Sequence, residues 1–186
     1  MFDLDTFVAE CRAALRETGS ELAVKAVVER AVSEPSHVET ALGTPRRGEI
    51  ITLHHSPELT ILNVLWAPGM AIYPHDHRLW AVLGLYGGRE DNTFYRRTAD
   101  GLVASGGKQL DCSDVAILGK NVIHAVANPL GRLTGAIHVY GGDFFGTPRS
   151  EWDPATLQER PYDIERARRT FAEANARWEA LEGRST

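Results

Sequence analysis

Two histidines one residue apart, His75 and His77, are the strongest chemical signal in the sequence. Residues two apart in a strand point to the same face, so these imidazoles aim together if the segment is extended. Pro74 favours an extended segment, because a proline restricts the residue before it. Two imidazoles on one face suit a divalent metal ion, and His124, which starts an apolar run, is the best candidate for a third ligand. Taken alone, the pair is equally compatible with a structural or surface role, and a lone buried histidine is usually a hydrogen-bonded core residue.

Strands must bring these histidines together, and the sequence predicts them from about residue 49 onward. Short β-branched and aromatic runs alternate there with Gly, Pro, Asn and Asp. The predicted strands are Ile50–Leu53, Leu59–Trp66, Ala71–Tyr73, Trp80–Tyr86, Asn92–Arg97, Leu102–Ala104, Val115–Leu118, His124–Ala127 and Leu133–Tyr140. Asp100-Gly101 is a hairpin signal between two of them. Many short strands at close spacing indicate a sandwich or barrel.

Both ends of the chain are predicted to be helical. Apolar residues recur at helical spacing from Leu4 to Leu15, and Ser20 can cap a second helix. Near the C-terminus, one apolar stripe runs from Ile164 to Leu181 and ends at Gly183. These elements predict one domain over residues 1–186, with a helical segment at 1–45, a β-barrel at 49–145 and a covering helix at 160–183.

The overall composition excludes several classes of protein. A content of 43% hydrophobic and 24% charged residues is that of an ordinary globular protein, and the net charge of -5 argues against nucleic acid as a partner. No apolar run approaches the roughly 20 residues that cross a bilayer. The N-terminus lacks the apolar region of a signal peptide, so we expect a cytoplasmic protein. Cys11 and Cys112 are too few for a disulfide framework.

The arrangement of glycines around the histidines resembles the cupin family. Gly69, His75, His77 and Gly88 match the first cupin motif, and the segment 114–128, which includes His124, resembles the second. The resemblance covers residues 50 to 141. It implies a mainly β fold, the cupin double-stranded β-helix or jelly-roll barrel, here with N-terminal helices and a C-terminal helix.

The sequence departs from the cupin pattern at the glutamate ligand of the first motif. Ala81 and Val82 stand where the family has that glutamate. Glu90 lies beyond Gly88, and we interpret it as a solvated charge at the end of a loop. The predicted site therefore consists of three neutral histidines without a carboxylate, which leaves open positions on the metal ion for a substrate and O2.

A three-histidine cupin of this length resembles the thiol dioxygenases, the cysteine dioxygenase family. It is also similar to bacterial predicted metal-dependent double-stranded β-helix enzymes. The first similarity includes the residues of the two motifs and Trp66, His138 and Tyr140. It implies a non-haem iron dioxygenase that holds Fe(II), with Ni, Mn or Zn as other metals that imidazole accepts. The resemblance also implies a small thiol and O2 as substrates, and the lack of a long apolar run predicts no membrane partner.

The same resemblance assigns catalytic roles to His138 and Tyr140. In the family, a Ser–His–Tyr relay lies beside the iron, and His138 and Tyr140 match its last two members. Ala136 stands in place of the serine. The alternative for His138 and Tyr140 is a buried hydrogen-bonded pair without a catalytic role.

The residue that anchors the substrate is not identified by the resemblance. The family uses an Arg or Gln upstream of the first motif, whereas this chain has His54 and His55 there, which are more often surface residues. Another cupin enzyme, such as a C–C-cleaving dioxygenase, a lyase or an isomerase, and a non-catalytic binding cupin therefore remain alternatives. A homodimer is compatible with the resemblance, because cupins often pair through their sheets.

Overall fold

The computed structural model describes residues 1–18, 20–99 and 101–183. Three helices form the N-terminal segment: α1 (Leu4–Thr18), α2 (Glu21–Val32) and α3 (Pro35–Leu42). Asp3 Oδ1 accepts a hydrogen bond from the backbone N–H of Thr6, and Ser20 Oγ accepts one from Leu22, so α1 and α2 both begin at side-chain caps. The prediction that Ser20 caps the second helix is confirmed.

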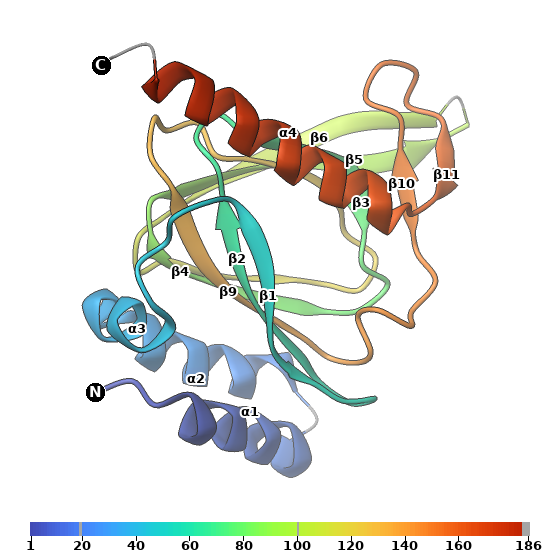
Figure 1. Cartoon of the computed structure of the whole chain (residues 1–186). Helices are drawn as coiled ribbons and strands as arrows, with labels where there is room; N and C mark the ends of the chain where they lie inside the picture. The colour runs from blue at the N-terminus through green and yellow to red at the C-terminus, as the bar shows by residue number, and fades with distance from the viewer. Residues whose placement is uncertain (19, 100, 184–186) are drawn as a thin grey trace.

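Two antiparallel sheets follow these helices (Figure 1). The first sheet has the order β1 (Glu49–His55), β2 (Thr60–Trp66), β9 (Thr134–Tyr140), β4 (Ala81–Gly87) and β7 (Val115–Leu118). The second has the order β11 (Glu159–Pro161), β10 (Ser150–Trp152), β3 (Ala71–Asp76), β8 (Ile123–Ala127), β5 (Arg89–Thr98) and β6 (Gly101–Asp111).

The order of the strands shows how the barrel is built. From β2 to β9 the chain crosses repeatedly between the sheets, so that the order β2-β9-β4-β7 faces the order β3-β8-β5-β6. Two four-stranded sheets connected in this way form a jelly roll. The expected mainly β fold, with helices at both ends, is confirmed.

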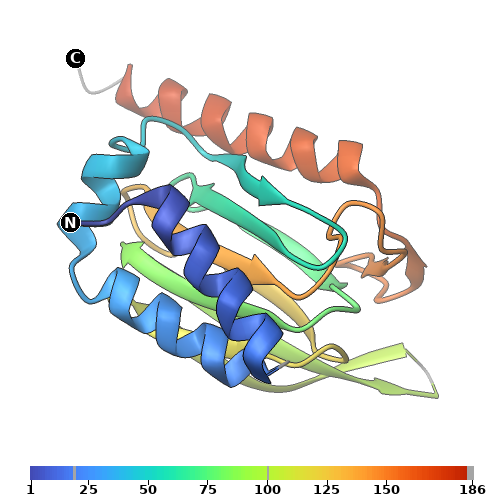
Figure 2. The same cartoon turned by 90° about the horizontal axis from the view of Figure 1, so that it is seen from below.

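The central strands of the first sheet, β2, β9 and β4, are buried on both faces. Inside the barrel, alternate residues such as Leu62, Leu83 and Ala136 belong to the barrel core. The residues between them, such as Ile61 and Val139, pack against the N-terminal helices in a second core. Figure 2 shows α1 and α2 across this outer face. A strand that is covered on both faces has a mostly apolar sequence, because the side chains on both faces are buried. Every residue of β2 and β9 is buried in this way.

The C-terminal helix, α4 (Ile164–Glu182), lies on the other side of the barrel from α1 and α2 (Figures 1 and 2). Phe171 and Ala174 join the barrel core, and Asn175 exchanges two hydrogen bonds with the backbone of Gly48 just before β1. In the described part of the chain, no helix is both long enough and apolar enough to span a bilayer.

Each predicted strand corresponds to an observed one, but the ends differ, most of all in β6, which was predicted as Leu102–Ala104 and extends to Asp111. β5 begins at Arg89, three residues before the predicted Asn92, and β3 continues to Asp76. β10 and β11 were not predicted, because each has three residues and only Trp152 among them supplies a large apolar side chain. The hairpin signal Asp100-Gly101 falls in part on residue 100, which lies outside the described residues.

Candidate metal centre

A β-bulge in β3 directs His75 into the barrel. Ile72 pairs with Val126 of β8, but His75 pairs with His124, so β3 has one extra residue between them. Ile72 belongs to the barrel core, and strict alternation would turn residue 75 outward. The bulge restores its inward direction, and it contains Pro74, which has no N–H to donate to a ladder. His75 and His124 are therefore direct cross-strand neighbours.

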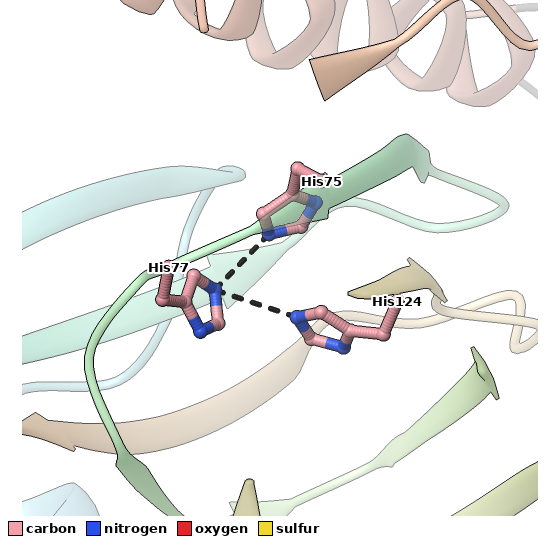
Figure 3. Close-up of side chains that lie close together, drawn as sticks. All are labelled: His75, His77 and His124. Atoms are coloured by element: carbon pink, nitrogen blue, oxygen red, sulfur yellow. Dashed lines mark hydrogen bonds between the residues drawn. The ribbon is translucent and has the colours of Figure 1, made fainter. Parts of the chain in front are cut away.

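The three predicted histidines meet at one point inside the barrel (Figure 3). His77 Nε2 lies 3.1 Å from His75 Nε2 and 3.4 Å from His124 Nε2. Two metal–nitrogen bonds of about 2.0–2.1 Å that meet at an octahedral or tetrahedral angle separate their nitrogens by about 2.8–3.4 Å. The two separations therefore match what one metal ion requires.

The other ring nitrogens show which tautomer two of the histidines adopt. His75 Nδ1 donates a hydrogen bond to the carbonyl of Tyr73 at 3.0 Å, and His124 Nδ1 donates one to Asn92 Oδ1 at 2.8 Å. With the proton on Nδ1, the Nε2 atom of each ring presents a lone pair to the cluster. Such partners orient the imidazole ligands of metal sites, so the donor set fits a divalent ion.

Burial keeps these imidazoles neutral. It lowers the pKa of His75 to about 4, together with the smaller effect of the charge of Arg149. Burial also lowers the pKa of His77 and His124 well below the ordinary value, and the neighbouring histidines add to the effect. A histidine must be neutral to bind a metal, so near neutral pH the cluster is already in the form that binds one.

His138 and Tyr140 lie on the inner face of β9, as predicted. The rings of Tyr140 and His77 are 5.0 Å apart, and the Tyr140 hydroxyl is 3.1 Å from His138 Nδ1. Burial raises the pKa of Tyr140, so its hydroxyl retains its proton. The structure thus places both residues beside the histidine cluster.

The interpretation of Glu90 as a solvated charge is wrong. Because β5 begins at Arg89, Glu90 and Asn92 both point into the barrel, and the side chain of Glu90 is 0% exposed. Its Oε1 accepts a hydrogen bond of 2.6 Å from Trp66 Nε1 and lies 3.1 Å from His138 Nε2. Gly87 and Gly88, just before the segment, suggested a loop, and the alternation of Glu90 with Asn92 was the only signal for a strand.

Arg149 also reaches the cluster, and sequence analysis did not identify it. Its guanidinium lies between two rings, 4.0 Å from the centroid of Phe144 and 4.2 Å from that of Tyr162. These two rings are in turn next to His77 and His75, at 6.1 and 5.9 Å. Arg149 Nε is buried and has no hydrogen-bond partner among the described residues. Arg149 follows β9 in an irregular segment, where no periodicity indicates the direction of a side chain.

Other residues singled out in the sequence lie outside the cluster. His55 pairs with Asp143 at the surface, and His54 belongs to β1. Asn128 donates to the carbonyls of Trp66, Ala67 and Arg132, so it braces loops at one end of the barrel. Asp76 points away from the cluster and pairs with Arg78 and Arg97, which agrees with its place between two inward-facing histidines.

Several solved structures are similar to this chain over part of its length. No protein-family model matches the sequence. An RmlC-like cupin with a double-stranded β-helix from Methanocaldococcus jannaschii has a TM-score of 0.46 and 11% identity, over 55% of this chain and 86% of that chain. A cupin superfamily protein from Desulfitobacterium hafniense has a TM-score of 0.44 and 17% identity, over 55% and 85%. The DMSP lyase DddQ from Ruegeria pomeroyi has a TM-score of 0.46 and 16% identity, over 59% and 53%.

The fold is the cupin double-stranded β-helix, and its interior contains a three-histidine group that could bind a metal ion.

Proposed function

We propose that this protein is a metal-dependent cupin oxygenase of the thiol dioxygenase type, which converts a small thiol and O2 into a sulfinate. The observation that carries the proposal is the position of Tyr140. Its ring lies beside His77, and its hydroxyl is hydrogen-bonded to His138, in a site whose metal-binding group is made of histidines alone. These features together are what the resemblance to thiol dioxygenases implies.

The proposed reaction is balanced without a further reductant. A thiol and O2 combine to a sulfinic acid, both oxygen atoms end on sulfur, and the four electrons that reduce O2 come from the sulfur atom. Fe(II) bound by His75, His77 and His124 would supply electron transfer to O2 and a positive charge that lowers the pKa of a nearby thiol.

Tyr140 and His138 act as hydrogen-bonding groups in this proposal. The Tyr140 hydroxyl keeps its proton because burial raises its pKa, and it donates that proton in a hydrogen bond to His138 Nδ1, so that its oxygen can accept a hydrogen bond from a group beside the histidine cluster. His138 Nδ1 orients the hydroxyl from the opposite side. Positioning of both reactants beside one ion would remove much of the entropic barrier.

Arg149 defines the class of thiol that we propose. A guanidinium between two rings, with a buried Nε that lacks a partner, is ready to bind a carboxylate. Since Phe144 and Tyr162 also contact the histidines, a carboxylate at Arg149 would leave the rest of a short molecule near the cluster. We therefore propose a small thiol that carries a carboxylate.

The test compares thiols with and without a carboxylate. The full-length protein is loaded anaerobically with Fe(II) and given O2 with 3-mercaptopropionate, cysteine or cysteamine. O2 consumption is measured together with sulfinate formation by mass spectrometry under labelled O2. We expect two labelled oxygens in the product and a rate with 3-mercaptopropionate or cysteine above that with cysteamine.

Two variants and a second panel complete the test. Arg149→Gln should raise KM for the carboxylate thiols with little effect on cysteamine, whereas Arg96→Gln, at an exposed arginine on β5, should leave both unchanged. Bound iron without thiol oxidation would reject the dioxygenase, and turnover of diketones would assign another class of cupin enzyme. Failure to bind a metal after anaerobic loading would favour a binding protein.

A further inference from the structure

Glu90 is a buried carboxylate whose contacts point to one chain of residues. It is fully buried inside the barrel, where an unpaired charge is strongly unfavourable. Among the described residues it has no Lys or Arg partner: Oε1 contacts Trp66 and His138, and Oε2 has no hydrogen-bond partner. A buried acid with so few partners requires an explanation beyond packing.

The contacts of His138 continue from Glu90 to the metal centre. His138 Nε2 is 3.1 Å from Glu90 Oε1, its Nδ1 is 3.1 Å from the Tyr140 hydroxyl, and the Tyr140 ring is 5.0 Å from that of His77. The chain Glu90–His138–Tyr140 therefore begins at a carboxylate in the interior and ends beside the histidine cluster. His138 has a hydrogen-bond partner at each ring nitrogen.

We propose that Glu90 is a positioning residue that completes a Tyr140–His138–Glu90 relay. An ionised carboxylate can only accept hydrogen bonds, so it fixes a proton on His138 Nε2. Nδ1 then accepts the hydrogen bond from the Tyr140 hydroxyl and can take its proton while the carboxylate stabilises the imidazolium. Glu90 thus supplies the third group that Ala136, which has no hydroxyl, cannot provide.

Two further contacts hold the carboxylate in place. Trp66 donates to the same Oε1 atom at 2.6 Å, and its indole stacks on Phe171 of α4 at 5.5 Å. The carboxylate is therefore held from β2 and α4 as well as from its own strand. Contacts of this kind keep a positioning residue in a fixed geometry. The relay rests on the proposed function, because Tyr140 acts in it on a substrate at the cluster.

The variant Glu90→Gln separates a relay from a merely structural role. The amide oxygen of glutamine can accept both hydrogen bonds that Oε1 accepts now, so shape and contacts persist while the charge is lost. If Glu90 only accepts hydrogen bonds from Trp66 and His138, the activity of Glu90→Gln should equal that of the wild type. A relay predicts a loss of about 10- to 1,000-fold in kcat, with KM within about threefold.

A double-mutant cycle then tests whether Glu90 acts through Tyr140. The activity of Glu90→Gln, Tyr140→Phe and the double variant is measured on the iron-loaded protein. Because the two residues would belong to one chain, the double variant should be no worse than the poorer single variant. Losses that multiply in the double variant would overturn the proposal, and so would an unchanged kcat in Glu90→Gln.

A readout without substrate keeps this inference distinct from the proposed function. Nitrogen-15 NMR of the zinc-loaded protein assigns the protonated nitrogen of His138. We expect His138 to have its proton on Nε2. The NMR signal of that proton should lie strongly downfield and move upfield in Glu90→Gln. A proton on Nδ1 alone, or a signal unaffected by the substitution, would reject the relay. If the wild type oxidises no thiol while the NMR result is as expected, the proposed function fails and the hydrogen-bonded relay stands.

Discussion

The two faces of the first sheet each contain a buried tyrosine, and their surroundings differ. On the outer face, under the N-terminal helices, the Tyr86 hydroxyl donates to Asn63 Oδ1 at 2.8 Å. On the inner face, the Tyr140 hydroxyl meets His138, which continues to Glu90. The same strands thus provide a two-residue contact on one side and a chain of ionisable groups on the other.

The difference shows how one sheet separates stability from chemistry. The pair of Tyr86 and Asn63 is surrounded by apolar side chains of the outer core, so its hydrogen bond contributes to stability alone. Tyr140 is surrounded by the rings of His77, Phe144 and His138, and it therefore connects the sheet to the histidine cluster. Burial raises the pKa of both tyrosines, so burial by itself does not distinguish a functional residue from a structural one.

The largest effect should come from the histidine cluster at the inner face. His124→Ala removes one of three ligands, and we expect metal affinity to fall by more than about 100-fold, since loss of a supporting residue alone costs about 10- to 100-fold. Metal content after dialysis measures the effect. His37→Ala, at an exposed histidine of α3, is the control. Full metal binding by His124→Ala would show that His124 is not a metal ligand, and the inner face would then have no three-histidine site to set against the outer face.

The comparison of the two tyrosines is tested by the same substitution on each face. Tyr140→Phe should lower kcat by about 100-fold or more, the lower range for a group that transfers a proton. Tyr86→Phe should leave kcat unchanged. Each variant should lose about 0.5–1.5 kcal/mol of the free energy of unfolding, because each loses one buried hydrogen bond. Equal effects on kcat would show that the two faces do not differ in function.

The pH dependence of stability should also come from the inner face. In the metal-free protein, the pKa of His75 is about 4 in the folded state, below the ordinary value of 6.5. The unfolded chain then binds more protons between these values, so the free energy of unfolding should fall as the pH drops from 6.5 toward 4. The slope is about 1.4 kcal/mol per pH unit for each such group. Urea unfolding of the wild type and His75→Asn measures it, and identical slopes would contradict the assignment.

The smallest effect on activity should come from packing at the outer face. A Cβ atom at Gly84 of β4 would lie 2.3 Å from Val28 Cγ1 of α2. Gly84→Ala should therefore cost about 1–3 kcal/mol of the free energy of unfolding through overpacking. kcat and metal content should be unchanged. A loss of metal binding in this variant would show that the helices under the sheet control the inner face.

Local patterns were sufficient for most of the fold. Apolar runs bounded by turn residues predicted β2, β4, β7 and β9 closely, because these strands are long enough or apolar enough to stand out from the segments beside them. β10 and β11 have three residues each, so neither could show a period. The predicted metal-binding group, His75, His77 and His124, is brought together in the structure, although the bulge that turns His75 inward has no clear sequence signal beyond Pro74.

The sequence by itself determined the type of barrel and the residues that approach one another within it, because periodicity and motif spacing are local properties of the chain. Only the tertiary structure decided the positions of Glu90 and Arg149. Glu90 became a buried acid because β5 begins three residues earlier than its pattern indicated, and a shift in where a strand begins decides which side chains enter the core. Arg149 reaches the cluster from an irregular segment, whose direction is set by contacts with Phe144 and Tyr162 rather than by any repeating pattern.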